Sequence, residues 1–351
     1  MRIALILASN LYMAPYVRYY TEILEKCGVP YDIIAWNRFG VAEAGVQALN
    51  LTSSLHKSIF GKIIDYVRYK RFVKSKLVEG NYDKVVVFTI VNALMLFPFL
   101  KARYRNNYVF DIRDYSVALK YFRARLSAAI QDAALVVISS AGFKRWLPKD
   151  NTYVIRHNTN VFRPLDTLVK IKGQTKYKIL TIGAIGYYDA NRALIEHLAD
   201  SPMFELEFVG SGYAEQMLKD FVASRGIKNV SFLGRYAKED EPKYLQGAAL
   251  ISILMDDSIN SITCMSNRFY LSVVYGIPMI VNSNSEQGTC AEKYNLGIVI
   301  DKKSDIKKQI IRYLRMFDNE IFDIGRKAYL EIVQNDLDEF ELKFKKFLLN
   351  S

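Results

Sequence analysis

The chain has 351 residues, of which 51% are apolar, and this is enough for two ordinary globular cores. The three cysteines form no C-x-x-C pair, which argues against a disulfide framework or a zinc site and favours a reducing compartment. The formal net charge is +12, and residues 1–165 hold 24 Lys or Arg against 11 Asp or Glu. This one-sided excess predicts an anionic partner such as phosphate, an acidic membrane surface or nucleic acid.

The first half of the chain alternates between short β-branched runs and longer amphipathic runs. The runs "RIALILAS", "APYVRYYTEILEKCG" and "YDIIAW" predict a strand, a helix that ends at Gly28 and a second strand, which is the βαβ unit of a parallel sheet. We then expect a strand at "KVVVFTI", a helix capped by Asn92, a strand at "NYVFDI", a helix at "LKYFRARLSAAIQDA", a strand at "LVVISS", another helix, and a strand at "NTYVIRHN". The longest apolar run, 85–100, contains Asn92 and Pro98 and is shorter than the roughly 20 residues of a membrane span.

The second half restarts the same alternation after a mixed, charged connector at 165–177. From residue 304 onward the pattern is helical. The sequence therefore predicts the α/β class, with two doubly wound, Rossmann-like domains facing a cleft and a helical C-terminal tail. We expect domains at 1–164 and 178–334, and a helix at 335–351 that packs back on the first domain.

One stretch of the second half, "SNRFYLSVVYGIPMIV", predicts a helix that ends at Gly276 and a strand after Pro278. Asn267 and Arg268 then stand at the start of the helix. The unpaired N–H groups and positive dipole end of such a start, together with a guanidinium, are suited to holding an anion.

Together with "TIGAIGYYDANRALIEHL", "FELEFVGSGYAEQML", "NVSFLGRY" and "YNLGIVI", this stretch resembles the donor domain of GT-B glycosyltransferases of the family 4 type. "FDIRDYS", "LVVISSAGFKRWL" and "YVIRHNTNVFRPL" are similar to their acceptor domain. The resemblance runs in order over nearly the whole chain. It implies a hexosyltransferase-like enzyme that moves a sugar from a nucleoside-diphosphate sugar to a saccharide or lipid-linked acceptor in surface-polysaccharide assembly.

The resemblance places the donor diphosphate at the turn "GAIGYY", where Gly183 and Gly186 would let backbone amides approach it. A tight strand-to-helix turn is the structural alternative for these glycines, and a surface salt bridge is the alternative for Arg268. The other implied donor contacts are Arg192, Arg235, Tyr236, Asn267, Tyr270 and Glu286.

The chain departs from the family at Leu271, where relatives carry a glutamate that holds the donor ribose. Leucine accepts no hydrogen bond, and losing a charged acceptor typically removes about 1.5–3 kcal/mol of binding. Either another group such as Glu286 replaces it, or the donor is unusual, or donor binding is degraded. The last case leaves a non-catalytic GT-B-like protein that binds a nucleotide or saccharide as the alternative function. A solvated loop carboxylate is the structural alternative for Glu286.

The candidate catalytic group is "DIRD", at the carboxyl end of a predicted strand. Asp114 could take the proton of the acceptor hydroxyl while Arg113 holds an anionic group, and Asp111 and Asn10 could contact the acceptor. An Arg–Asp pair that closes the loop is the structural alternative. His157 is the second catalytic candidate.

We expect no metal or other cofactor, because the resemblance implies that helix dipoles and basic side chains stabilise the departing diphosphate. The Asp-x-Asp triplet at 336–338 is interpreted as a helix start. Asp256 and Asp257 lack the x spacing and are interpreted as loop carboxylates. The three histidines have no metal-ligand spacing.

Residues 56–77 hold seven Lys or Arg and one acid among apolar residues. As a helix, this segment suits anionic lipid headgroups, although an ordinary surface helix with one face in the core fits the pattern as well. We therefore expect a cytoplasmic protein with peripheral contact to the inner face of the cell membrane. A nucleic-acid binder is the third function considered, but no recognised module supports it.

Overall fold

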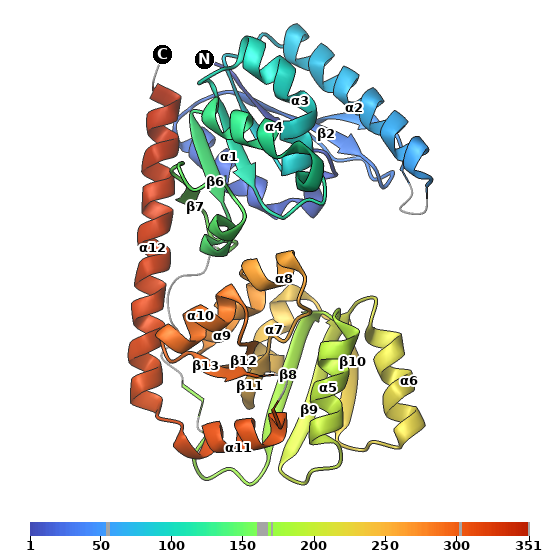
Figure 1. Cartoon of the computed structure of the whole chain (residues 1–351), viewed down its shortest axis with the longest axis vertical. Helices are drawn as coiled ribbons and strands as arrows, with labels where there is room; N and C mark the ends of the chain where they lie inside the picture. The colour runs from blue at the N-terminus through green and yellow to red at the C-terminus, as the bar shows by residue number, and fades with distance from the viewer. Residues whose placement is uncertain (54–56, 160–167, 170, 302–303, 350–351) are drawn as a thin grey trace. The chain divides into compact units, whose positions relative to one another are not determined.

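The computed structural model describes residues 1–53, 57–159, 168–169, 171–301 and 304–349. Parts of five predicted segments fall outside these residues, namely 54–56 and 160–164 of the first domain, 165–167 and 170 of the connector, 302–303 of the second domain, 350–351 of the C-terminal helix, and residue 56 of the basic segment. The chain forms two compact units, and Figure 1 shows a sheet with flanking helices in each of them. Unit 1 consists of residues 1–139, 146–156 and 336–351, and unit 2 of residues 140–145 and 157–335.

Unit 1 is built on a seven-stranded parallel sheet of order β3-β2-β1-β4-β5-β6-β7. The central strands consist of β-branched and aromatic residues buried on both faces, as a doubly covered parallel sheet requires. The strands are β1 (Ile3–Ile6), β2 (Tyr31–Asn37), β3 (Val46–Asn50), β4 (Lys84–Phe88), β5 (Tyr108–Ile112), β6 (Leu135–Ile138) and β7 (Val154–Ile155).

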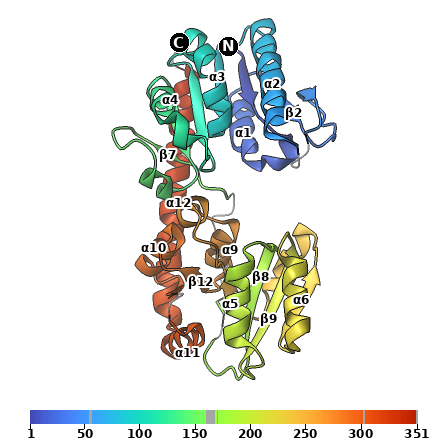
Figure 2. The same ribbon diagram turned by 45° about the vertical axis from the view of Figure 1, so that its right-hand side comes forward.

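The helices of unit 1 flank this sheet (Figures 1 and 2). They comprise the 3-10 turns η1 (Leu11–Met13) and η2 (Pro15–Val17) and the α-helices α1 (Arg18–Lys26), α2 (Ile59–Glu79), α3 (Ile90–Arg103) and α4 (Leu119–Gln131). Helix α1 ends where expected, with Gly28 in the left-handed conformation just after it.

Unit 2 has a six-stranded parallel sheet of order β10-β9-β8-β11-β12-β13. Its strands are β8 (Tyr177–Ala184), β9 (Phe204–Ser211), β10 (Val230–Gly234), β11 (Ala248–Ser252), β12 (Met279–Asn282) and β13 (Gly297–Ile300). The helical elements are η3 (Ala141–Arg145), α5 (Tyr188–Leu198), α6 (Glu215–Arg225), η4 (Lys238–Asp240), α7 (Glu241–Leu245), α8 (Ile259–Thr263), α9 (Asn267–Tyr275), α10 (Glu286–Lys293) and α11 (Ile306–Met316). The two doubly wound sheets confirm the predicted fold class.

The last helix, α12 (Asn319–Leu349), begins in unit 2 and contributes to unit 1 from Asp336 onward. Its end packs into the core of unit 1 through Phe340, Phe344 and Phe347. The expected helix start at 336–338 is wrong, because no residue there interrupts α12 and the triplet lies in mid-helix.

Three other local predictions differ from the structure. Helix α3 begins at Ile90, and Asn92 lies inside it, where its side-chain amide donates to the carbonyl of Ile6 at 2.9 Å. The helix expected after β6 is only the 3-10 turn η3. Glu286, expected in a loop, is the first residue of α10, whose start is capped by Ser285. At α10 a side-chain cap decides the helix start, and apolar periodicity carries no signal for such a contact.

Across the part of the chain that the structure describes, we find no helix that is both long enough and apolar enough to cross a bilayer.

Candidate functional site

The carboxyl ends of β8 and β9 approach each other closely in unit 2. Gly183 has a φ of 96° and Gly210 a φ of 123°. A Cβ on Gly210 would lie 1.9 Å from the carbonyl oxygen of Gly183, so only glycine fits there. A Cβ on Gly183 would meet nothing within 4 Å, so the backbone at the turn is open on that side. The turn therefore meets a packing requirement at Gly210 and leaves room for a ligand at Gly183.

Arg268 reaches this edge from the first turn of α9. Its guanidinium donates to the carbonyl of Ala184, at the end of β8, at 2.8 Å, and to the carbonyl of Ser252, at the end of β11, at 3.3 Å. Burial lowers the pKa of Arg268, and the hydroxyls of Tyr187 and Tyr236 act in the opposite direction. Arginine remains charged under such shifts. The surface salt bridge considered from sequence is not what holds this residue, because its guanidinium donates to the backbone at two strand ends.

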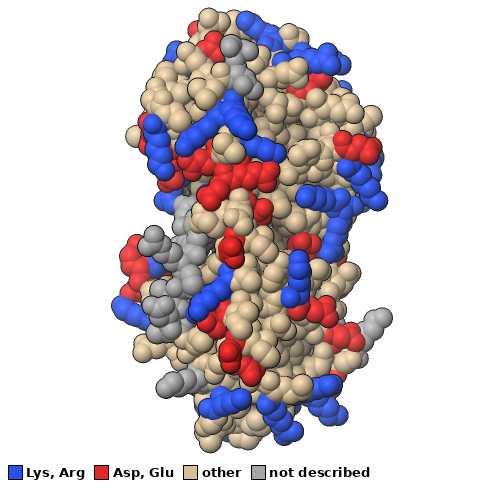
Figure 3. Space-filling model, turned by 90° about the vertical axis from the view of Figure 1, so that its left-hand side faces the viewer, with Lys and Arg blue, Asp and Glu red and all other residues tan. Residues whose placement is uncertain are grey.

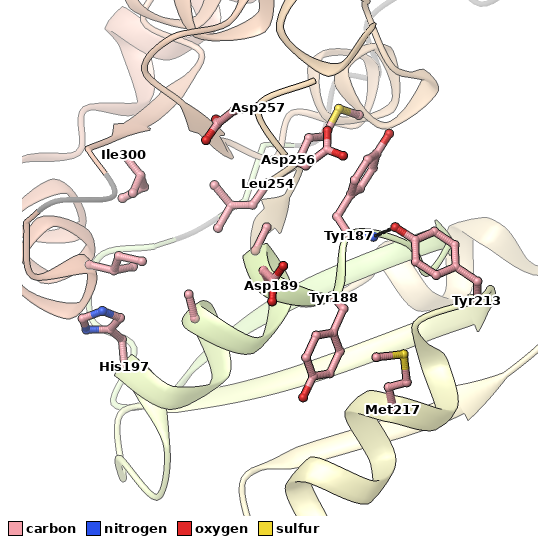
Figure 4. A pocket seen from close by; sticks show the side chains of 14 residues that line it. Tyr187, Tyr188, Asp189, His197, Tyr213, Met217, Leu254, Asp256, Asp257 and Ile300 are labelled. Atoms are coloured by element: carbon pink, nitrogen blue, oxygen red, sulfur yellow. Dashed lines mark hydrogen bonds between the residues drawn. The ribbon is translucent and has the colours of Figure 1, made fainter. Parts of the chain in front are cut away.

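A pocket of about 670 Å³ opens beside this edge, within the size range of small-molecule sites. Figure 4 shows that it runs along α5, with His197 and Ile300 toward one end and Tyr213 and Met217 toward the other. Leu254, Asp256 and Asp257, from the segment after β11, complete the lining.

Tyr187 connects the pocket to Arg268. It caps the start of α5 in the left-handed conformation, with a φ of 57°, which is uncommon for a residue other than glycine. Its backbone N–H donates to the hydroxyl of Tyr213 at 2.8 Å. Burial raises the pKa of the Tyr187 hydroxyl, and Arg268 lowers it. Sequence reasoning missed Tyr187, although it directly follows Gly186 in the turn that the resemblance singled out.

Asp256, which was set aside from sequence as a loop carboxylate, lies at the same pocket. Its carboxylate accepts the backbone N–H of Ser258 at 3.2 Å and the hydroxyl of Ser261. Among the described residues, no three His, Cys, Asp or Glu side chains gather as a metal-ligand set.

Two other predicted donor residues lie at the ends of unit 2 elements. Arg235 follows β10, and its Nε donates to the hydroxyl of Ser211, the last residue of β9, at 3.0 Å. Tyr236 donates to Glu241 at 3.2 Å, and burial, followed by this carboxylate, raises the pKa of Tyr236 to about 12. Both residues belong to the same sheet edge as Arg268.

Arg192 and Glu286 are held by other partners. Arg192 faces outward on α5 and pairs with Glu196 at 3.0 Å, one helical turn away. Glu286 pairs with Arg145 at 3.3 Å. The structure thus does not bring Arg192 into the pocket lining, and it gives Glu286 a cation as partner.

Three of the predicted residues lie on α9 or against it, and they differ in exposure. Asn267 is exposed at its first position, whereas Tyr270 is buried. The hydroxyl of Tyr270 lies 2.8 Å from Nδ1 of His157, and both side chains are buried in unit 2. Leu271 is half-buried beside Tyr270. His157 therefore lies against α9.

In unit 1, Asp111 and Arg113 form a buried ion pair. Asp111 is fully buried, and its carboxylate accepts from the hydroxyl of Tyr20 and from the guanidinium of Arg113, each at 2.5 Å. Burial alone would lower the pKa of Arg113, but the Asp111 carboxylate outweighs it and raises the pKa above the usual range. Asp111 thus has the structural position of an Arg–Asp pair, and its burial leaves it no surface for the acceptor contact expected from sequence.

Asn10 is likewise buried and fully bonded. Its amide group donates to Asn37 at 3.0 Å and to the carbonyl of Val41 at 3.1 Å. Its oxygen accepts the backbone N–H groups of Arg38 at 2.9 Å and Phe39 at 3.2 Å. All four hydrogen bonds of the side chain are used, so Asn10 shapes the segment after β2 and has no group left for the expected ligand.

Asp114 differs from its neighbours because its side chain is exposed, and no hydrogen bond or ion pair holds its carboxylate within the described residues. Partial desolvation by the surrounding chain raises the pKa of Asp114, and Arg113 opposes the shift. A carboxylate with a raised pKa and room around it is suited to accepting a proton.

Arg156, which sequence reasoning did not single out, follows β7 as Arg113 follows β5. Its guanidinium lies 3.5 Å from the centre of the Tyr19 ring. Burial lowers the pKa of Arg156 to about 10, and the nearby Arg113 contributes to the decrease. Two buried arginines at one sheet edge give this part of unit 1 a positive character.

Comparison with solved structures identifies the architecture. Sucrose-phosphate synthase from Thermosynechococcus elongatus is similar over 99% of this chain and 98% of its own, with 13% identity and a TM-score of 0.69. The apo form of the lipopolysaccharide outer core galactosyltransferase WaaB is similar over 99% of both chains, with 12% identity and a TM-score of 0.65.

The chain has the GT-B fold. Another protein with this fold, Alr3699/HepE from Anabaena in complex with UDP and glucose, covers 99% of both chains with 13% identity and a TM-score of 0.64. No protein-family model and no curated protein sequence matches the chain. At these identities the likeness establishes the GT-B fold, and the function has to be argued from the site.

Proposed function

We propose that the protein is a glycosyltransferase that moves one sugar from a nucleoside-diphosphate sugar to a saccharide or lipid-linked acceptor, in the assembly of a surface polysaccharide. The observation that carries this proposal is the position of Arg268. Its guanidinium joins the carboxyl ends of β8 and β11 beside an open glycine turn and a pocket of about 670 Å³. Ligands of open α/β sheets bind at such edges.

The proposed role of Arg268 is to bind the diphosphate and to stabilise the negative charge that develops on it as the sugar leaves. The open backbone at Gly183 and the side chain of Tyr187 lie at the same edge, and we propose that Gly186 and Asn267 add donor contacts there. We propose that no metal is required, because a guanidinium and the N-terminal end of α9 supply positive charge directly.

For the acceptor side we propose Asp114 as the base. Its carboxylate has no fixed partner among the described residues and a raised pKa, so it can take the hydroxyl proton as the acceptor oxygen attacks the anomeric carbon. Arg113 is a positioning residue, because it is buried and bonded to Asp111. His157 remains the second candidate, and its contact with Tyr270 ties it to α9.

Two structural neighbours support the surface-polysaccharide context. One is a lipopolysaccharide outer core galactosyltransferase, and another is WaaG, a glycosyltransferase involved in lipopolysaccharide biosynthesis. We propose a cytoplasmic location for this chain, at the inner face of the cell membrane, and no nucleic-acid partner.

The alternative function, a non-catalytic binding protein, is favoured by Leu271. Its apolar side chain follows Tyr270 on α9, so it offers no hydrogen-bond acceptor to a donor ribose. Glu286, the replacement considered from sequence, is bonded to Arg145.

The test is the thermal stability of the purified protein with a panel of nucleoside diphosphates and nucleotide sugars. UDP and UDP-glucose come first, because the Anabaena protein was solved with them. A ligand at about 100 times its dissociation constant adds about 2.7 kcal/mol and raises the midpoint by a few degrees. A shift followed by sugar transfer supports the enzyme, a shift without turnover of any donor supports the binding protein, and no shift with any nucleotide contradicts both.

A further inference from the structure

Helix α2 has an inner face that accounts fully for its attachment to unit 1. Asp65, Tyr69, Val73 and Leu77 are spaced four residues apart and are all buried. Tyr69 stacks on Trp36 at 5.3 Å and donates its hydroxyl to the carbonyl of Leu7. The core of unit 1 therefore does not need any other face of this helix.

The outer face of α2 nevertheless carries a second apolar stripe. Its members are Phe60, Ile63, Ile64 and Val67, which are exposed by 80%, 53%, 53% and 42%, respectively. At 100° per residue their mean direction lies about 150° from the inner face. Four large apolar side chains at i, i+3, i+4 and i+7 form a continuous exposed strip, which an ordinary surface helix lacks.

The charges around this strip have one sign. Arg71 and Lys74 continue the outer face toward the C-terminus of the helix, and Arg68 is exposed beside it. Asp65 is the only acidic residue between 59 and 78, and it is buried, where Lys57 and Ser53 bind it and Lys57 lowers its pKa. By contrast, the face that carries α12 mixes both signs (Figure 3).

We propose that this outer face of α2 docks unit 1 onto an anionic lipid bilayer. Phe60, Ile63, Ile64 and Val67 enter the boundary between headgroups and acyl chains, while the arginines and lysines beside them bind lipid phosphates. Apolar burial and attraction to anionic headgroups then act together. A bilayer fits better than a protein partner, because an exposed apolar strip flanked by basic side chains is the pattern of helices that lie in the membrane interface.

The orientation of α2 adds a consequence for the acceptor. The apolar strip lies in the first turns of the helix, and Ser53 ties these turns to the end of β2 by bonding both Asp65 and the carbonyl of Arg38. Further exposed apolar side chains follow β1 and β2 at this same edge, and two of them, Tyr12 and Phe39, have ring centres 6.4 Å apart. Docking therefore turns the carboxyl edge of the unit 1 sheet toward the lipid. Taken with the proposed function, on which this step rests, the geometry points to an acceptor held in the membrane by an apolar tail.

The test is co-sedimentation of the full chain with phosphatidylcholine vesicles, with and without phosphatidylglycerol. We expect binding that requires phosphatidylglycerol and weakens as salt is raised. The double variant Ile63→Ser/Ile64→Ser should lower the partition coefficient by about tenfold or more, and Arg71→Glu/Lys74→Glu should remove the dependence on phosphatidylglycerol.

The matched control is Ile321→Ser/Ile324→Ser on α12, where the two isoleucines are exposed by 53% and 63%. It should bind vesicles like the wild type. Equal loss in both isoleucine variants, or no vesicle binding by the wild type, overturns the proposal. A wild type that is dimeric in solution, with a monomeric Ile63→Ser/Ile64→Ser variant and no vesicle binding, would assign the strip to a second copy of the chain. The thermal shift with nucleotides is measured on every variant, so failure of docking is distinguishable from failure of the transferase proposal.

Discussion

The carboxyl edges of the two sheets carry similar polar residues and use them in opposite ways. In unit 1, Asn10 is buried and bonded to residues at and after the end of β2, and Asp111 and Arg113 are buried and bonded to each other. In unit 2, Arg268 reaches the strand ends beside an open turn and a pocket. The comparison teaches that a polar residue after a parallel strand either closes the edge or serves a ligand, and that burial of its side chain against other side chains marks the closed edge.

The sharpest test of this comparison uses one substitution at two positions three residues apart. Asp111→Asn removes the carboxylate that pairs with the buried Arg113, so we expect a loss of about 3–5 kcal/mol in the free energy of unfolding. Asp114→Asn should change it by less than about 0.5 kcal/mol while lowering sugar transfer by about 10²–10⁴. Urea denaturation and initial rates measure the two effects. Equal destabilisation by both changes would mean that the Asp111–Arg113 ion pair does not hold the edge of unit 1 together.

Arg268→Ala tests the open edge of unit 2. Removing its guanidinium should lower kcat/KM by about 10²–10³, the typical effect of losing one charge-stabilising donor, and should abolish the thermal shift with nucleotides. Arg192→Ala is the matched control, because Arg192 is exposed and paired with Glu196 on α5. We expect it to retain wild-type activity within about twofold. The site assignment fails if the two variants behave alike.

Two glycines allow the close approach of β8 and β9 to be separated from simple backbone freedom. Gly210→Ala places a methyl group 1.9 Å from the Gly183 carbonyl, so we expect a loss of about 3 kcal/mol of stability and a weaker nucleotide shift. Gly226 has a φ of 63°, and a Cβ there would meet nothing within 4 Å. Gly226→Ala should therefore cost about 1–2 kcal/mol of stability, with an unchanged nucleotide shift. An unaltered shift in Gly210→Ala would show that the turn does not shape the binding site.

The smallest expected effect is on the pH dependence. The pKa of Asp114 is raised because partial burial disfavours its charged form. A base acts only when ionised, so transfer should fall with decreasing pH around a midpoint above the usual aspartate value of about 3.9. The same shift contributes stability to the fold at low pH, and this contribution is lost as the pH rises through the raised pKa. In Asp114→Asn the acid limb of the rate profile should disappear, and an unchanged limb would assign it to another group.

The sequence predicts the fold well because apolar periodicity is local. The strand-and-helix order, the helix end at Gly276 and the polar residues after each strand all depend on neighbours within a few positions. The role of those polar residues depends on partners that are distant in the sequence. Asn10 is saturated by residues 27 to 31 positions away, and Asp111 accepts a hydrogen bond from Tyr20, 91 positions away.

The residues that sequence reasoning missed have the same explanation. Tyr187 lines the pocket because its backbone is left-handed and Tyr213, 26 positions later, receives its N–H. Asp256 joins the pocket through the fold of the segment after β11. Arg156 becomes buried only when Tyr19 and α12 cover it.

The end of α12 has a consequence for how the molecule is made. Phe340, Phe344 and Phe347 belong to the core of unit 1, and the buried ammonium group of Lys84 holds the last carbonyls of the helix, including that of Leu348 at 3.2 Å. A ribosome adds about 5–20 residues per second from the N-terminus, so the first 139 residues emerge long before these partners exist. Part of the apolar interior of unit 1 therefore stays uncovered until the residues that follow unit 2 in the sequence have been translated. Unit 1, although it is synthesised first, can complete its core only after that.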